Sequence, residues 1–300
     1  MTNSHRDTTS RRQFLRGTLA AAGAVAMLGP RRILGGTSET AGTARWAFLS
    51  DTHIPANPED NYRGFYPYKN LETVVAQMSA DLPDGLVITG DLARLEGLPG
   101  DYVNARKLLM PIIERRPVCV GLGNHDNRAN FLEVFSEPGG KKQPVNGKHV
   151  VVVETGPVRL IVLDSLLYVN KVAGLLGRSQ RTWLEQILRT GDAKPTILFF
   201  HHTLGDGDGD LLDVPRLFEL IKPASQVKAL VFGHSHVHDY SEFEGIHLIN
   251  LPASGYNFND AQPVGWVDAR LTAEGGHFTL RAVGGNTQND GRVRELRWRS

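Results

Sequence analysis

Residues 46–122 alternate between short apolar runs and longer stretches with helical spacing. The runs WAFLS (46–50), GLVIT (85–89) and VCVGL (118–122) predict three buried strands. Between them, residues 70–81 place Leu, Val, Val and Met at helical intervals, and residues 102–115 predict a second helix. Alternating strands and helices indicate parallel strands joined by crossover helices.

The pattern changes after residue 148. HVVVVE (149–154) and VRLIVLD (158–164) flank Thr-Gly-Pro and predict a hairpin. A helix is expected over 181–189 and another over about 211–221, and two buried strands over 196–200 and 228–232. Four short strands follow, in HDYSEF, HLINL, GWVDARL and HFTLRAV. We therefore expect one domain over residues 45–283 and a loose polar tail over 284–300.

The N-terminal segment has the features of an export signal. Ser10-Arg11-Arg12-Gln13-Phe14-Leu15-Arg16 resembles a twin-arginine signal, and a mild apolar run extends from Gly17 to Leu28. That run is shorter than the roughly 20 residues that a membrane span needs. We expect residues 1–44 to be a signal peptide and linker and the protein to be periplasmic or secreted. A disordered tail and a short membrane anchor are the alternatives.

Composition and charge narrow the classes of function. The chain has 300 residues, of which 41% are hydrophobic and 22% charged, as in ordinary globular proteins. Residues 1–44 hold six of the 33 basic residues and two of the 32 acidic ones, so the remainder carries a net charge of −3. The chain has no basic stripe of the kind that binds nucleic acid, so we expect no nucleic-acid partner. The single cysteine, Cys119, cannot form an internal disulfide and is expected to be a buried thiol.

Asp, His or Asn side chains, all of types that bind metal ions, follow each of five buried strands. They are Asp51-Thr52-His53, Gly90-Asp91, Gly123-Asn124-His125-Asp126, His201-His202 and Gly233-His234-Ser235-His236. The carboxyl ends of strands in an open α/β sheet form a ligand crevice, so these groups are expected to converge. One Asp-x-His or Gly-Asp pair alone is no more than a turn, but five such groups in one chain indicate a site.

The ligand types indicate a metal centre. Carboxylate, imidazole and amide oxygen, without thiolate, suit two divalent ions such as Mn, Fe or Zn. Seven such groups exceed the needs of one tetrahedral ion. They suit two ions about 3.5–4 Å apart that share a carboxylate, as in two-metal phosphoryl-transfer sites.

The order D-x-H, G-D, G-N-H-D, His and G-H-x-H resembles the calcineurin-like metallophosphoesterase superfamily over about residues 46–255. The resemblance implies a four-layer α/β/β/α sandwich of two mixed sheets flanked by helices. It implies that Asp91 bridges the two ions. It further implies one ion on Asp51, His53 and His236, and another on Asn124, His201 and His234.

The resemblance also implies the reaction. A metal-bridging hydroxide would attack phosphorus, His125 would assist the leaving oxygen, and Asp126 would orient His125. We expect a metal-dependent hydrolase of small phosphate esters, and we favour a phosphodiesterase over a phosphomonoesterase. A non-catalytic metal- or phosphate-binding protein is the alternative from another class. The substrate, the metals and the oligomeric state stay open.

Several positions depart from the family pattern or leave a choice. Purple acid phosphatases carry Tyr three residues after the bridging Asp, where this chain has Arg94. His201 is the expected ligand, with His202 as its rival, because the family's His-His-Pro-Pro ending is absent. His238 would face the site only if 234–238 were extended. The Gly-Asp repeat over 205–210 lacks the final Glu of an EF-hand loop and is expected to be a loop beside the metals. Residues 54–68 are expected to form a rim loop.

Overall fold

The computed structural model describes residues 42–300, so the expected signal peptide lies almost wholly outside the described residues. The described helices are α1 (Pro67–Ala80), α2 (Pro99–Ile113), α3 (Arg128–Val134), α4 (Arg178–Thr190) and α5 (Val214–Ile221). The described strands are β1 (Ala44–Leu49), β2 (Gly85–Ile88), β3 (Val118–Val120), β4 (Lys141–Lys142), β5 (Val151–Glu154), β6 (Arg159–Val162), β7 (Thr196–Phe199), β8 (Val227–Phe232), β9 (Asp239–Phe243), β10 (Ile246–Asn250), β11 (Pro263–Leu271), β12 (Gly275–Gly285) and β13 (Val293–Arg297).

The strands form two mixed sheets. The first has the order β13-β12-β11-β1-β2-β3, in which β1, β2 and β3 are parallel and the other pairs are antiparallel. The second has the order β4-β5-β6-β7-β8-β10-β9, in which β6, β7, β8 and β10 are parallel. The predicted hairpin is confirmed, since β5 and β6 pair antiparallel with Val151 opposite Val162.

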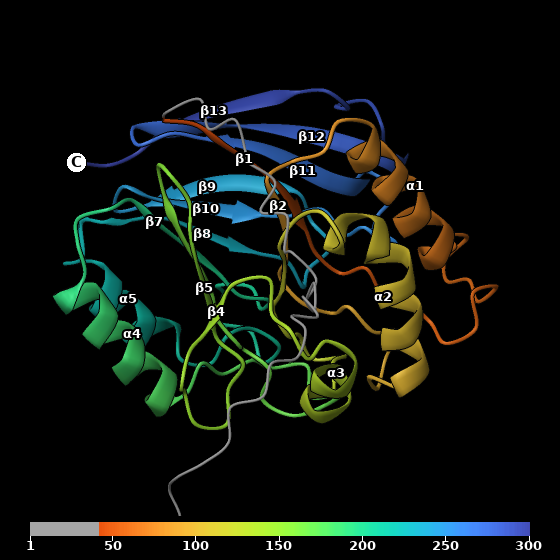
Figure 1. Cartoon of the computed structure of the whole chain (residues 1–300), viewed down its shortest axis with the longest axis horizontal. Coiled ribbons are helices and arrows are strands. Elements are labelled where there is room, and N and C mark those ends of the chain that lie inside the picture. Colours follow the sequence, from red (N-terminus) through yellow and green to blue (C-terminus); the bar gives the residue numbers. More distant parts are fainter. Residues whose placement is uncertain (1–41) are drawn as a thin grey trace, which may run out of the picture. The chain divides into compact units, whose positions relative to one another are not determined.

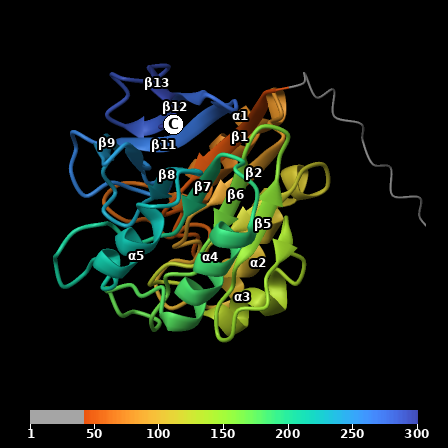
Figure 2. The ribbon, with the colours of Figure 1, turned by 90° about the vertical axis from the view of Figure 1, so that its left-hand side faces the viewer.

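Helices cover the outer face of each sheet, which gives the expected four layers. Figure 1 shows α1, α2 and α3 on one side of the two sheets and α4 and α5 on the other. In the first outer core, Leu71 of α1 packs with Leu49 of β1 and other buried residues. In the other, Leu184 of α4 belongs to the cluster that contains Leu198 of β7. The turned view in Figure 2 shows α4 and α5 in front of the second sheet.

The two sheets face each other across an apolar core. Phe48 of β1 and Phe199 of β7 meet edge to face, with ring centroids 4.8 Å apart. Every residue of β2, β7 and β8 is buried, so these parallel strands have one face on the inter-sheet core and the other under helices. Cys119 lies in this core, and burial raises the pKa of its thiol to about 12.

The C-terminal residues differ from the expected loose tail. β12 continues to Gly285, and Val293–Arg297 forms β13, which pairs antiparallel with β12 at the edge of the first sheet. Only Leu296 of β13 is buried. An edge strand with one buried side chain has no apolar run, so its sequence is indistinguishable from a polar tail.

The short helix α3 was also not expected from the sequence. The side chain of Asn127 caps it, because its Oδ1 accepts hydrogen bonds from the amides of Ala129 and Asn130. Phe131 is its one buried residue, so the helix has no apolar periodicity to read. Within residues 42–300, no helix has the length and apolarity needed to cross a membrane.

Candidate metal centre

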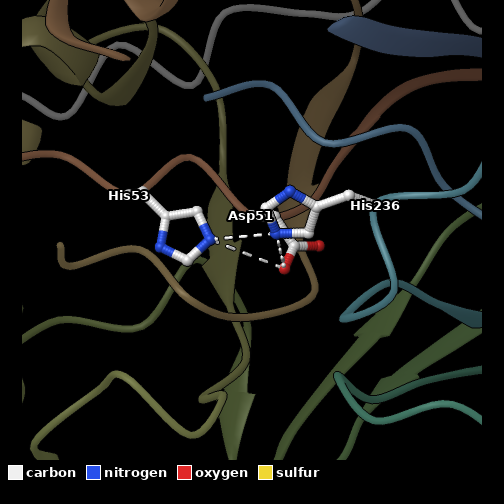
Figure 3. A group of neighbouring side chains, drawn as sticks. All are labelled: Asp51, His53 and His236. Atoms are coloured by element: carbon white, nitrogen blue, oxygen red, sulfur yellow. Dashed lines mark hydrogen bonds and ion pairs between the residues drawn. The ribbon is translucent and has the colours of Figure 1, made fainter. Parts of the chain in front are cut away.

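One group of buried side chains joins the ends of β1 and β8. Asp51, His53 and His236 each offer one ligand atom, and these atoms lie within 4.8 Å of one another. His236 Nε2 is 3.1 Å from His53 Nε2 and 3.3 Å from Asp51 Oδ1. Figure 3 shows the two imidazoles and the carboxylate turned toward one point. The predicted first ligand set is therefore brought together.

A second group lies next to the first. Asp91, His201 and His234 also offer ligand atoms within 4.8 Å of one another. His201 Nε2 is 3.2 Å from Asp91 Oδ2 and 3.3 Å from His234 Nδ1. Asn124, predicted for this set, is 3% exposed, and its Oδ1 has no hydrogen-bond partner among the described residues. A buried amide oxygen without a donor suits a cation.

Asp91 connects the two groups, as expected of a bridging carboxylate. Its Oδ2 lies 3.9 Å from His53 Nε2 in the first group and 3.2 Å from His201 Nε2 in the second. Its Oδ1 accepts a hydrogen bond of 2.8 Å from the amide of His125. The other carboxylate also faces both groups, because Asp51 Oδ1 is 3.8 Å from His201 Nε2.

Backbone carbonyls orient three of the four imidazoles. His53 Nδ1 lies 3.3 Å from the carbonyl oxygen of Arg94, and His236 Nδ1 lies 2.7 Å from that of Tyr256. His234 is turned the other way, with Nε2 3.0 Å from the carbonyl oxygen of Gly209. A ring nitrogen that donates to a carbonyl leaves the other nitrogen unprotonated, and in each ring that nitrogen points into the cluster.

The carboxylates also fit a cation. Asp51 is fully buried, and its Oδ2 accepts hydrogen bonds from the hydroxyl of Ser50 and the amide of His234. Its Oδ1, which faces the imidazoles, has no hydrogen-bond donor among the described residues. A buried carboxylate oxygen without a donor is costly unless a positive charge lies beside it. The donor set therefore fits two divalent ions.

The pKa shifts of the protein groups also indicate that the two carboxylates need a positive charge beside them. Burial favours the neutral form of Asp51 and Asp91, but His201 and other nearby imidazoles outweigh it and hold both pKa values below their ordinary range. Burial lowers the pKa of His201, yet Asp91 and Asp51 outweigh burial and raise it to about 9. Burial lowers the pKa of His53 to about 3. Without metal, the two acids thus retain a proton on His201 as their counter-charge.

Left-handed backbone marks the predicted ligands. Asp51, His53, Asp91, His234 and His236 all have φ between 48° and 72°, among eight non-glycine residues with positive φ in residues 42–300. Such a conformation costs a non-glycine residue about 1 kcal/mol or more. The turns after β1, β2 and β8 therefore adopt a less stable backbone conformation that directs these side chains into the site. Because His234 and His236 have this conformation, residues 234–238 are not extended, and His238 is not directed to the cluster.

Gly123 permits the closest approach of two of these turns. A Cβ built on it would lie 2.2 Å from Asp91 Oδ1 and 2.7 Å from the Asp91 amide nitrogen. Any side chain here would displace the shared carboxylate. The glycine before Asn124 therefore lets the loop after β3 lie against the loop after β2.

The structure distinguishes the two neighbouring histidines after β7. His201 Nε2 faces Asp91, whereas His202 Nδ1 lies 2.8 Å from the hydroxyl of Ser165. The His202 ring lies beside that of His234, tilted by 43° with centroids 4.7 Å apart, and burial holds the pKa of His202 well below the ordinary value. His201 belongs to the candidate ligand group and His202 does not.

His125 lies at the rim of the cluster. Its Nε2 is 4.0 Å from Asp91 Oδ2. Its side chain is 22% exposed, whereas those of His53, His201 and His236 are at most 2% exposed. Its Nδ1 lies 2.9 Å from the carbonyl oxygen of Leu95 and 3.1 Å from Asn170 Oδ1. A group in this place can reach a phosphate ester held on the ions.

Asp126 does not orient His125, contrary to expectation. It is fully buried and accepts hydrogen bonds from the amides of Leu92, Ala93 and Gly123 and from the Tyr102 hydroxyl. Burial and the charge of Asp91 raise its pKa to about 6. The residue ties the loop after β2 to the loop after β3. The sequence could not reveal this, because adjacency to His125 suggested a direct contact while the side chain turns inward.

The remaining candidates divide into near and distant ones. His238 lies away from the cluster, with Nδ1 3.2 Å from the carbonyl oxygen of Asn250. The 205–210 loop lies beside the centre as expected, since the Gly209 carbonyl contacts His234. The rim loop over 54–68 also reaches the site, because the Tyr62 ring contacts that of Tyr256 at 4.7 Å between centroids.

Comparisons with known sequences agree with this geometry. A family model described as calcineurin-like phosphoesterase matches residues 44–238. The chain is 28% identical over 238 residues to a probable cyclic nucleotide phosphodiesterase of Synechococcus sp., a match covering 76% of this chain and 88% of that protein. It is 28% identical over 218 residues to a glycerophosphodiester phosphodiesterase of Enterobacter lignolyticus, covering 69% and 76% respectively.

Solved structures support the fold. A dimetal phosphatase from Danio rerio is similar with a TM-score of 0.67 at 13% identity, over 86% of this chain and 100% of that one. A purple acid phosphatase from yellow lupin is similar with a TM-score of 0.60 at 16% identity, over 85% and 53%. At these identities the likeness concerns the four-layer arrangement alone.

Proposed function

This chain belongs to the calcineurin-like phosphoesterase family, and from that premise we propose that it is an exported binuclear phosphodiesterase acting on small phosphate diesters. The observation that carries the proposal is the pair of ligand groups joined at Asp91. Two divalent ions held there would bind a phosphate ester, neutralise its developing charge and activate water.

The protein's own residues have distinct tasks in this reaction. The two carboxylates, the four imidazoles and Asn124 would hold the ions, and backbone carbonyls fix the orientation of three of the imidazoles. His125, which lies outside the two candidate ligand groups, would donate a proton from Nε2–H to the leaving oxygen of the ester. The buried hydrogen bonds of Asp126 keep the loops that carry Asp91 and Asn124 in register.

Apolar side chains near both ligand groups support a diester substrate. The Phe258 ring stacks on His236 at 4.4 Å and is 50% exposed. Near the second ligand group, Val172 is 55% exposed and lies against Gly209, whose carbonyl contacts His234. A phosphate with organic groups on two sides would contact both surfaces. The relatives named above as phosphodiesterases support the same preference.

The decisive experiment compares a diester with a monoester. The chain without residues 1–44, supplied with Mn²⁺, is expected to cleave bis-p-nitrophenyl phosphate with kcat/KM at least about tenfold above that for p-nitrophenyl phosphate, a difference of about 1.4 kcal/mol. Chelator should abolish both activities, because the ions supply the charge stabilisation. Preference for the monoester would make the protein a phosphatase, and no cleavage by metal-loaded protein would favour a binding role.

The export part of the proposal rests on the paired arginines, Arg11 and Arg12, and the apolar run behind them. In a bacterium with a twin-arginine pathway, the full chain is expected in the periplasmic fraction or the medium. The double substitution Arg11→Lys/Arg12→Lys should leave it in the cytoplasm, while preserving the positive charge. Equal distribution of the two proteins between fractions would refute twin-arginine export without touching the proposed reaction.

A further inference from the structure

Asn170 contacts the residues of the site from a loop that the sequence analysis did not single out. The loop spans residues 165–176, between β6 and α4. The amide of Asn170 donates a 2.7 Å hydrogen bond to the carbonyl oxygen of Asn124, one of the predicted ligands. Its side-chain Oδ1 lies 3.1 Å from His125 Nδ1. Asn170 therefore contacts two consecutive residues of the loop after β3.

The surroundings of Asn170 define which ring nitrogen of His125 carries the proton. The Asn170 amide nitrogen Nδ2 lies 3.4 Å from the Glu96 carboxylate, which orients the amide oxygen toward the imidazole. The Leu95 carbonyl oxygen lies 2.9 Å from the same Nδ1. Two oxygen acceptors at Nδ1 favour the tautomer protonated there, so Nε2 is left toward the metal cluster.

The base of the loop is fixed, so Asn170 is held in place. Lys148 Nζ donates to the carbonyl oxygens of Leu166 and Leu175, at the two ends of the loop, at 2.9 and 2.8 Å. The amide of Leu175 donates to the Ser165 carbonyl, and Leu166 forms a bridge with Gly174. These bonds close the loop behind its tip.

Asn170 itself has left-handed backbone, with φ of 59°. Asparagine adopts this conformation more easily than most residues, and glycine adopts it without strain. A glycine here would therefore keep the backbone and its bond to Asn124 and would remove only the side chain.

We propose that Asn170 is a positioning residue for His125: its Oδ1 accepts a hydrogen bond from Nδ1–H and so directs Nε2 toward the leaving oxygen. When the ring donates the proton of Nε2–H to that oxygen, Nδ1–H stays bonded to Asn170, so both ring nitrogens carry a proton before the transfer. This inference rests on the proposed function for the role of His125, although the contact itself does not depend on it. Asn170 thus takes the orienting role that the sequence had assigned to Asp126.

A double-mutant cycle tests the proposal on bis-p-nitrophenyl phosphate. Asn170→Gly is expected to lower kcat about tenfold with little change in KM, the scale of losing a residue that orients a functional imidazole. In the His125→Ala background the same substitution should have no further effect on kcat. Asn170→Asp, which keeps an oxygen acceptor and tolerates positive φ, should stay within about threefold of wild type. Val169→Ala, in the same loop, is the matched control.

A second readout is independent of activity. In zinc-loaded protein with ¹⁵N-labelled histidines, the His125 ring, identified by its loss in His125→Ala, should carry a proton on Nδ1, the nitrogen bonded to Asn170. Asn170→Gly should shift the Nδ1 resonance, because the Leu95 carbonyl is then the remaining acceptor at this nitrogen. An unchanged ring spectrum, or an equal loss of kcat in both backgrounds, would overturn the proposal. If wild type cleaves neither test ester, the proposed function fails and the ring spectrum still decides this inference.

Discussion

Replacing Asp91 with alanine is expected to reduce kcat for the diester by about 10³-fold or more, because several kcal/mol of charge stabilisation disappear and each 1.36 kcal/mol is tenfold in rate. Asp91 Oδ2 faces imidazoles of both ligand groups. Its Oδ1 also accepts the amide of His125, so the substitution removes a support of that residue as well. The variant should bind fewer than two metal ions per chain by elemental analysis.

The matched control for Asp91→Ala is Asp208→Ala. Asp208 is an exposed carboxyl in the loop after β7, and its loss changes the net charge equally. Its kinetics and metal content should equal those of wild type. If Asp91→Ala kept two ions and more than about a tenth of the activity, the shared-carboxylate arrangement would be wrong. Circular dichroism of both variants separates this result from unfolding.

The ligand positions could be predicted because two independent signals coincide in them. Apolar runs identify buried strands, and parallel strands bring their carboxyl ends to one edge of a sheet, which places Asp51 after β1 near Asp91 after β2. His234 follows β8 of the second sheet, so its approach to Asp91 depends on the packing of the two sheets. Their residue types then restrict the chemistry to divalent cations. The four-layer fold followed from the resemblance of the motifs, since periodicity alone gives the elements and not the packing of two sheets.

The contacts behind the ligands could not be predicted in the same way. Carbonyls of Arg94, Gly209 and Tyr256 orient the imidazoles, but a carbonyl is present in every residue and leaves no trace in the sequence. The left-handed φ values of Asp51 and His236 are equally invisible, because glycine is the residue that normally marks such turns. The sequence thus predicts which side chains act, and the structure is needed for what holds them.

Asp126 is a residue that the sequence identified but whose contacts only the structure revealed. Its replacement by alanine is expected to destabilise the fold by about 3–5 kcal/mol, as for a buried charged group in a hydrogen-bond network. The substitution leaves three buried amides and the Tyr102 hydroxyl without their acceptor. In a domain of this size, the melting temperature should fall by about 10 °C. Differential scanning calorimetry of metal-free protein measures this without any contribution from bound ions.

A graded series distinguishes this structural role from the catalytic one that adjacency to His125 had suggested. Tyr102→Phe removes the hydroxyl that donates to Asp126 and accepts from the Asn127 amide, and should cost about 1–2 kcal/mol while leaving kcat near wild type. Asp126→Asn keeps the shape but turns one acceptor into a donor, so its stability should fall between those of Tyr102→Phe and Asp126→Ala. If Asp126 instead acted through His125, Asp126→Asn would lower kcat with an unchanged melting temperature. Because its oxygens contact amides of both loops and not the imidazole, we expect stability to fall along the whole series, and any loss of kcat in the two Asp126 variants to come with a lower melting temperature.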